Sequence, residues 1–364
     1  MKKISWWEPT IGRKEYKLIQ NVLQSNFPNE GKFTTQFEKK IQDLLRVKHA
    51  IAVTSGTAAI FLALKALGIG HGDEVIVPDL TFIATANSVV MCGAKPILVD
   101  VNPQNLTLDI KSFRDAITSK TKAVIPVHVS GRAADMEQIK NLAKEKKLYI
   151  IEDAAEAFMS KCNGSYLGTI GDAGCFSFSP AKTITTGQGG VIVTNNSKLA
   201  LSLRELKDQG RPTRGTGGDD IHNSIGFNFK FTDLQAAIGI GQLDYLKTRI
   251  ARIKKTYKIY KEKLQDVEEI KIFEFKIDQD EIPQWIDAAC KNRNELDKFL
   301  EKNNVFCRRL WHPIHRQKPY KQEDRNFPYS SKVSPRTLWL PSSFTMTDKD
   351  VATVCSYIRQ FYKQ

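Results

Sequence analysis

Short β-branched runs alternate with helix-like stretches from residue 49 to residue 195, and this alternation restricts the fold more than any other feature of the sequence. A chain that passes repeatedly from strand to helix builds a largely parallel sheet covered by helices on both faces. The predicted strands are 50–54, 74–77, 96–99, 123–127, 149–152, 175–179 and 191–194. The predicted helices between them are 57–67, 84–91, 110–117 and 135–146. Reactive side chains of such α/β folds gather where strands lead into loops at their carboxyl ends.

The second half of the sequence predicts a smaller unit of mixed character. A helix is expected at 197–207, a flexible glycine-rich surface loop at 208–223, and a helical hairpin formed by 232–243 and 247–263. After residue 265 the strands and helices are shorter, which favours an α+β domain. A chain of 364 residues is long enough for two unequal domains, and we expect a large one at 1–245 and a small one at 246–364.

The excess of basic residues is densest in one predicted helix. The chain carries 54 Lys and Arg against 40 Asp and Glu, which gives a formal net charge of +14. Within 247–263 the basic residues recur every three or four positions, with Ile250, Ile253 and Tyr257 between them, as in an amphipathic helix with a solvated basic face. This interpretation is favoured over a nucleic-acid site, and no nucleic-acid partner is expected.

Cysteine usage and hydropathy favour a cytoplasmic protein without a membrane partner. The six cysteines are far apart and form no CxxC pair, so neither a disulfide framework nor a zinc ribbon is indicated, and no metal is expected. The lysines near the N-terminus are not followed by an apolar segment, and no run of about 18 apolar residues occurs.

Three segments at predicted strand ends carry unusual residues, and the first is TSGTAA at 54–59. A strand stops there, Gly56 lets the backbone turn, and an alanine-rich helix begins. The free N–H groups at the start of that helix and the hydroxyl of Thr57 suit a phosphate. An ordinary helix cap explains the same residues equally well.

The other two segments supply an acid and an amine. In IIEDAAEA at 150–157, Asp153 ends an apolar strand, where a carboxylate needs a cation or several hydrogen bonds; the alternative is a helix cap. In SFSPAKTITTGQGG at 177–190, Lys182 stands among hydroxyls and glycines between two buried strands, where desolvation can make its amine a nucleophile. A surface salt bridge is the alternative for Lys182.

Together the three segments match the requirements of pyridoxal 5'-phosphate. This cofactor needs an anchor for its phosphate, a counter-charge for its ring nitrogen and an amine that forms a Schiff base with its aldehyde. The phosphate cradle at Gly56, the strand-end Asp153 and, 29 residues later, Lys182 supply these three groups. The combination is more specific than any of its parts.

The sequence resembles the sugar aminotransferases of the DegT/DnrJ/StrS family, which have the fold type I architecture of pyridoxal phosphate-dependent transferases. Six motifs in family order cover nearly the whole chain: TSGTAA at 54, GDEVIVPDLTFIATANSV at 72, PVHVSGRAADM at 126, IEDAAEA at 151, SFSPAKTITTGQGG at 177 and IGFNFKFTDLQAAIG at 225. The resemblance implies a large domain with a mostly parallel central sheet flanked by helices, plus a smaller C-terminal α+β domain.

The resemblance also implies roles for single residues. Lys182 would form the Schiff base, Asp153 would pair with the ring nitrogen, and Phe82 would stack on the ring. Phosphate ligands would be Gly56, Thr57 and Ser177, and Asn228 would reach the phosphate from the other subunit of a homodimer, so that each active site is shared across the interface.

Three segments depart from the family pattern. Glu156, counted here among the cofactor-binding residues, replaces a glutamine that many members carry. Gln188 replaces a frequent glutamate, and FNFK replaces YNYR, which puts Lys230 where arginine is usual.

The activity implied is transamination from L-glutamate to a nucleotide-linked keto sugar. The segments at 25–38, 93–101, 152–157 and 182–187 most resemble those of family members that aminate C4 of 4-keto-6-deoxy sugars. The alternatives are amination at C3 and amination of a UDP- or dTDP-linked 4-keto sugar. Candidate substrate contacts lie in FCRRLWHPIH: Arg308, Arg309, His312 and His315.

Three other functions are disfavoured by particular residues. A sugar 3-dehydratase would carry histidine in place of Lys182. A nicotinamide-dependent oxidoreductase lacks support because the first strand–helix turn has no GxGxxG. A basic nucleic-acid-binding protein on an inert transferase fold is disfavoured by the intact pair of Asp153 and Lys182.

Overall fold

The computed structural model describes residues 2–212 and 219–363 of the chain. The strands in these ranges are β1 (His49–Val53), β2 (Glu74–Pro78), β3 (Lys95–Val99), β4 (Thr121–Val124), β5 (Tyr149–Asp153), β6 (Lys161–Cys162), β7 (Ser165–Tyr166), β8 (Ala173–Ser177), β9 (Gly190–Thr194), β10 (Ile270–Ile272), β11 (Ile286–Cys290), β12 (Arg308–Arg309) and β13 (Thr337–Leu340).

The α-helices are α1 (Arg13–Gln24), α2 (Lys32–Leu45), α3 (Gly56–Ala66), α4 (Ala84–Met91), α5 (Ile110–Asp115), α6 (Met136–Lys146), α7 (Ser197–Lys207), α8 (Asp233–Leu243), α9 (Leu246–Leu264), α10 (Arg293–Lys302), α11 (Pro328–Val333) and α12 (Asp348–Tyr362). Short 3₁₀ helices lie at Val129–Gly131, Ile277–Gln279, Ile314–Arg316, Lys318–Tyr320, Asp324–Asn326 and Ser334–Arg336.

The large sheet has the strand order β1-β9-β8-β5-β4-β2-β3, seven strands among the described residues. The pairs from β8 to β3 are parallel, whereas β9 runs antiparallel to both β8 and β1. Strand β1 therefore points the same way as β8, and only β9 is reversed. All seven strands predicted from the alternation are present, and the prediction of a mostly parallel α/β fold is confirmed.

Helices cover both faces of this sheet, which explains its continuous apolar strands. In β1, Ile51 and Val53 pack into the core under α3, whereas Ala50 and Ala52 pack into the core under α2 and α8. Because neighbouring strand residues point to opposite faces, a strand with partners on both faces is apolar throughout. All five residues of β2 and of β9 are buried.

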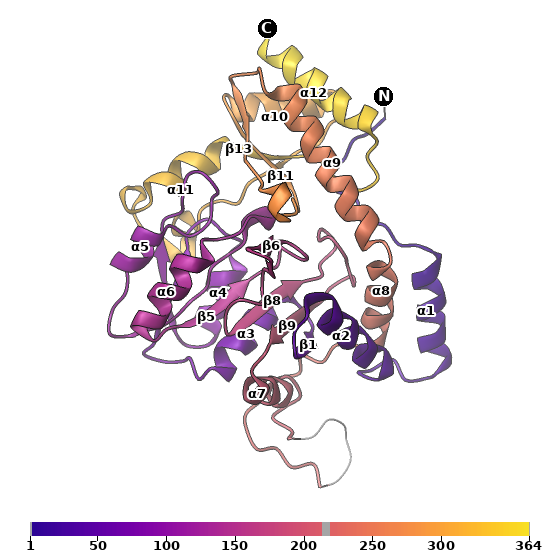
Figure 1. Ribbon diagram of the computed structural model, residues 1–364, viewed down its shortest axis with the longest axis vertical. Helices are drawn as coiled ribbons and strands as arrows, with labels where there is room; N and C mark the ends of the chain where they lie inside the picture. Colours follow the sequence, from indigo (N-terminus) through magenta and orange to yellow (C-terminus); the bar gives the residue numbers. More distant parts are fainter. Residues whose placement is uncertain (1, 213–218, 364) are drawn as a thin grey trace.

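A second, antiparallel sheet has the strand order β10-β11-β13-β12 among the described residues. Its core contains residues from α9, α10 and α12, and in Figure 1 these three helices surround the sheet at the end of the molecule where both termini lie. Ile4 bridges to Val305 and belongs to the same core, so the first residues of the chain pack with this unit. The division of the chain into 1–245 and 246–364 remains a proposal.

The predicted helical hairpin is wrong. Helix α8 ends at Leu243 and α9 begins at Leu246, and in Figure 1 α9 continues away from α8 toward the small sheet instead of folding back on it. Asp244 and Tyr245, which join the two helices, both have right-handed helical dihedral angles. Residues in that conformation keep the chain moving in one direction, whereas a hairpin needs a reversing turn. Helices α1 and α2, which pack against α8, were not predicted.

The basic helix α9 is less solvated than the sequence indicates. Arg249 is buried, and its guanidinium donates to Gln242, Thr10 and the carbonyl of Thr183. Further along the helix, basic side chains form ion pairs with acidic ones; these are Arg252 and Lys255 with Asp348, Lys254 with Asp280, and Lys261 with Glu274. Neighbouring acids therefore offset much of the positive charge on α9.

Part of the predicted glycine-rich loop, residues 213–218, lies outside the described residues. Asp208, where the predicted loop begins, forms a β-bridge with Asn228, which follows the loop. In the described part of the chain, no helix combines the length and the apolar character that a membrane span requires.

Candidate active site

A pocket of about 290 Å³ opens at the edge of the large sheet where the parallel strands end. Its walls come from the segments that follow β1, β2, β5 and β8, and from strands and loops of the second sheet. This volume is close to the lower end of the usual range for small-molecule sites. The predicted site residues that line it are Gly56, Thr57, Phe82, Asp153, Glu156, Ser177, Lys182 and Arg308.

The start of α3 forms a cradle at one end of the pocket. Ser55 caps the helix by accepting a hydrogen bond from the N–H of Ala58 at 3.1 Å. Among the described residues, no backbone hydrogen bond uses the N–H groups of Gly56 and Thr57, the first two residues of α3. A Cβ atom on Gly56 would lie 2.9 Å from Cβ of Ser177, so glycine is required for the close approach. Free N–H groups at a helix start, beside two hydroxyls, suit a phosphate.

Asp153 is the last residue of β5 and is buried beneath the pocket. Its carboxylate accepts a hydrogen bond from Oγ1 of Thr85 at 2.8 Å and from the N–H of Ala155 at 3.2 Å. Burial nevertheless raises the pKa of this carboxyl above its ordinary value. Because both of these donors are neutral, a cation in the pocket would stabilise the ionised form of this carboxylate.

Lys182 lies in the segment between β8 and β9 and points at Glu156. Its Nζ is 3.3 Å from Oε1 of Glu156 and 4.7 Å from the centre of the Trp285 ring. Oε2 of Glu156 accepts a hydrogen bond from the N–H of Ser130 at 2.9 Å. Burial raises the pKa of Glu156 to about 7, although Lys182 and the Ser130 N–H act in the opposite direction. Lys182 is thus a shielded amine and not a solvated surface lysine.

Phe82 completes a set of groups that fits pyridoxal phosphate. Its side chain lines the pocket but is 53% exposed, which is unusual for a large aromatic residue beside a core. An exposed ring in a pocket wall offers a face on which a flat heteroaromatic group can stack. The donor set agrees with this cofactor, because the cradle at Gly56 suits the phosphate, buried Asp153 suits a protonated ring nitrogen, and Lys182 supplies the amine.

The opposite wall is aromatic, and the sequence analysis did not find it. All five tryptophans of the chain pack together, and Trp285, Trp311 and Trp339 line the pocket. The guanidinium of Arg308 lies 4.9 Å from the Trp6 ring centre and 5.5 Å from that of Trp339. The available signal in the sequence was that the tryptophans lie toward the two ends of the chain, but positions along the chain cannot show that their side chains pack together.

Arg308 differs from its neighbour Arg309. Arg308 forms no ion pair within the described ranges, so its charge remains available to an anion that enters the pocket. Arg309 points elsewhere and pairs with Asp297 at 3.0 Å. Because neighbouring strand residues face opposite sides, only one of these two arginines can reach the pocket.

Three other predicted site residues do not line the pocket. His312 is exposed. His315 is fully buried, with one ring nitrogen 2.6 Å from Asp79 and the other 2.9 Å from Asp324, so both nitrogens are committed and the prediction of a substrate contact is corrected. Asn228 is exposed and does not line the pocket of its own chain, and its role toward a second subunit remains a prediction.

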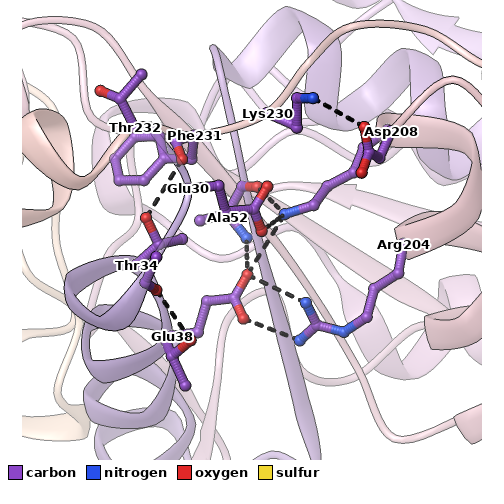
Figure 2. A network of polar contacts seen from close by, with 12 residues as sticks. Glu30, Thr34, Glu38, Ala52, Arg204, Asp208, Lys230, Phe231 and Thr232 are labelled. Carbon is purple, nitrogen blue, oxygen red and sulfur yellow. Dashed lines mark hydrogen bonds and ion pairs between the residues drawn. The ribbon is translucent and has the colours of Figure 1, made fainter. Parts of the chain in front are cut away.

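A partly buried network of polar contacts joins residues 230–231 to α2, α7 and β1 (Figure 2). Glu38 pairs with Arg204 at 2.9 Å and accepts a hydrogen bond from the N–H of Ala52, while Lys207 pairs with Glu30 at 2.8 Å. Lys230 pairs with Asp208 at 2.9 Å and bridges to Val53, immediately before the phosphate cradle. Thr34 donates to the carbonyl of Phe231, as Figure 2 shows. The network therefore fixes residues 230–231 against the end of β1.

The described residues contain no group of three or more His, Cys, Asp or Glu side chains arranged to hold a metal ion.

Comparisons with known proteins show the family to which the chain is similar. Residues 9–359 match the DegT/DnrJ/EryC1/StrS aminotransferase family. The chain is 35% identical to GDP-perosamine synthase of Escherichia coli O157:H7, covering 100% of this chain and 99% of that protein. It is 37% identical to GDP-perosamine synthase of Caulobacter vibrioides, covering 98% of each. A crystal structure of a DegT DnrJ EryC1 StrS aminotransferase from Brucella abortus superimposes with a TM-score of 0.91 at 30% identity, covering 96% of both chains.

Proposed function

Because the chain belongs to the DegT/DnrJ/EryC1/StrS aminotransferase family, and is therefore a pyridoxal phosphate-dependent aminotransferase, we propose a specific reaction for it. The enzyme moves the amino group of L-glutamate to C4 of a nucleotide-linked 4-keto-6-deoxy sugar, as a step in making a cell-surface polysaccharide such as an O-antigen. Two relatives named GDP-perosamine synthase, which match over nearly their full length, favour a GDP-linked sugar.

The observation that carries this proposal is the meeting of three groups from separate motifs in one pocket. The cradle at Gly56, the carboxylate of Asp153 and the amine of Lys182 come from the ends of β1, β5 and β8, and the sheet brings them together. When bound, pyridoxal phosphate supplies an aldehyde that carries nitrogen covalently and a ring that takes up electrons from the substrate carbon.

Lys182 would perform two tasks in this reaction. Its Nζ would hold the cofactor between turnovers, and once displaced by the amino donor it would move a proton at the substrate carbon. A positioned acid or base of this kind contributes about 10²- to 10⁴-fold in rate. Trp285, whose ring lies 4.7 Å from Nζ, would exclude water from the amine.

Asp153 would hold the proton on the ring nitrogen, and Gly56, Thr57 and Ser177 would position the phosphate. The burial that raises the pKa of Asp153 in the protein alone also strengthens its interaction with a cation, because the local dielectric constant is low. Charge-assisted hydrogen bonds such as those of the cradle contribute about 1.5 to 3 kcal/mol each. They would serve positioning more than chemistry.

The test of this proposal is a substrate panel. Purified enzyme is incubated with L-glutamate and, separately, GDP-, UDP- and dTDP-4-keto-6-deoxy sugars, and 2-oxoglutarate is measured. We expect fastest turnover with the GDP-linked sugar and an amine at C4 of the product. Turnover restricted to a 3-keto sugar would contradict the assignment to C4, and a preference for UDP or dTDP would correct the nucleotide.

Arg308 is proposed to bind an anionic group of the substrate, and Arg309 provides a matched control. Loss of one charge-assisted hydrogen bond costs about 1.5 to 3 kcal/mol, so Arg308→Met should raise KM for the nucleotide sugar by about tenfold to about 100-fold. Arg309→Met removes an exposed ion pair and should change KM less than about twofold. Steady-state kinetics on both variants check this, and equal effects of the two changes would contradict it.

We also propose that two copies of the chain form a homodimer whose active sites are shared through Asn228. The Lys182→Ala and Asn228→Ala variants should each be impaired. After the two are mixed and subunits exchange, one site in each mixed dimer has both residues intact, so activity should recover to about a quarter of the wild-type value. A mixture no more active than the separate variants would place Asn228 outside its partner's site.

A further inference from the structure

We propose that Glu156 is the proton partner of Lys182: its carboxylate takes the proton of the Lys182 ammonium and leaves a neutral amine in the pocket. The inference deepens the proposed function, on which it rests, because a lysine can attach to an aldehyde only through an unprotonated nitrogen. It assigns to Glu156 a catalytic task at Nζ of Lys182 that binding of the cofactor does not require.

The contact between the two side chains is close and shielded. Nζ of Lys182 lies 3.3 Å from Oε1 of Glu156, and the side chains are 12% and 6% exposed. Within residues 2–212 and 219–363, Lys182 forms no other ion pair. The Trp285 ring centre lies 4.7 Å from the same amine. Glu156 is therefore the carboxylate placed to accept a proton directly from Nζ.

The carboxyl group is held so that it cannot turn away from the amine. Its second oxygen, Oε2, accepts the N–H of Ser130 at 2.9 Å. Ser130 has a φ of 53°, in the left-handed region, and its hydroxyl donates to Asp287 of β11 at 3.1 Å. Asp287 in turn is bound by Arg132 Nη1 at 2.6 Å. This chain of contacts fixes the backbone that presents the N–H to Glu156.

The charges that face Glu156 favour its protonated form. Asp153 at the end of β5 and Asp287 on β11 are negative and raise its pKa, and burial has the largest effect in the same direction. Lys182 and the Ser130 N–H lower it, and the pKa of Glu156 nevertheless lies at about 7. A buried ion pair loses its hydration, so a neutral acid beside a neutral amine is accessible near neutral pH.

The step is a proton transfer that needs no other reactant. The N–H bond of the ammonium breaks, an O–H bond forms on Oε1 of Glu156, and no electrons leave the pair. The pair holds one proton before and after, so the net charge of the pocket does not change. When Lys182 later needs a proton, the same carboxyl can return it.

The substitution Glu156→Gln tests the proposal because glutamine keeps the size of the side chain and an oxygen that can accept the N–H of Ser130, but cannot take up a proton. Infrared difference spectra of the protein alone, recorded from about pH 5 to about pH 9, report the protonated carboxyl directly. We expect the wild type to show a buried carboxyl that titrates near pH 7, and Glu156→Gln to lack that signal. Glu137→Gln, which removes an exposed carboxyl on α6, should retain it.

The rate at which enzyme stripped of cofactor captures pyridoxal phosphate, followed by absorbance, is the second readout. The wild-type rate should rise about tenfold per pH unit below pH 7 and level off above it, whereas Glu156→Gln should show no inflection near pH 7. A carboxyl that stays ionised across the range in the wild type, or identical rate profiles, would overturn the proposal. If the protein captures no cofactor at Lys182, the proposed function fails instead, while the infrared titration still decides the state of Glu156.

Discussion

Replacing Lys182 by alanine should abolish covalent capture of pyridoxal phosphate and lower kcat by on the order of 10³-fold or more. The change removes the amine that holds the cofactor and also the base that moves the proton, and the second task alone contributes about 10²- to 10⁴-fold. The cradle at Gly56 and the wall at Phe82 remain in this variant, so the cofactor should still bind, but reversibly. Absorbance after gel filtration and steady-state kinetics measure the two effects separately.

Lys198→Ala is the matched control for this experiment. Lys198 is exposed on α7 and does not line the pocket, and the same truncation there should leave cofactor content and kcat within about twofold. If Lys182→Ala kept a covalently bound cofactor, another lysine would have to hold it.

Replacing Asp153 by asparagine should lower kcat by about 10³-fold while cofactor content falls much less. A charge pair at close range and an effective dielectric constant near 20 is worth about 4 kcal/mol, and about 1.4 kcal/mol corresponds to a factor of ten in rate. The asparagine carbonyl can still accept the hydrogen bond of Thr85, which lies 2.8 Å from the carboxylate, so the shape of the site is kept. Single-turnover kinetics with L-glutamate alone isolate the affected half-reaction.

Asp172→Asn makes the same chemical change at the opposite edge of the same sheet. Asp172 precedes β8 and accepts the N–H of Ile150 at 2.8 Å, so its replacement reports on the stability of the sheet and not on the pocket. Its kcat should equal that of the wild type. A similar loss in both variants would mean that Asp153 acts on the fold and not on the ring nitrogen.

The large sheet and half of the pocket were predictable because their signals are local. Each strand is a short apolar run, and Gly56, Asp153 and Lys182 follow strands whose carboxyl ends must meet at one edge. The bounds were less accurate, since β4 ends at Val124 although a strand to residue 127 was predicted. The predicted strand 149–152 stops one residue before the end of β5, which includes Asp153.

The aromatic wall was not predictable because it depends on contacts between distant segments. Trp285 and Trp339 lie on or beside strands of the second sheet, and only the packing of that sheet against the large one brings them to the pocket. His315 shows the opposite error: its position near Arg308 suggested a substrate contact, but a buried histidine between Asp79 and Asp324 leaves no nitrogen for a ligand.

The central claim is that Lys182 is the lysine that binds the cofactor covalently, and chemical reduction tests it most directly. Borohydride fixes the linkage between pyridoxal phosphate and a lysine, and digestion followed by mass spectrometry then identifies the labelled peptide. We expect one labelled peptide, modified at Lys182, and no label in the Lys182→Ala variant. A label on any other lysine, or none on Lys182 in enzyme that contains the cofactor and is active, would contradict the account.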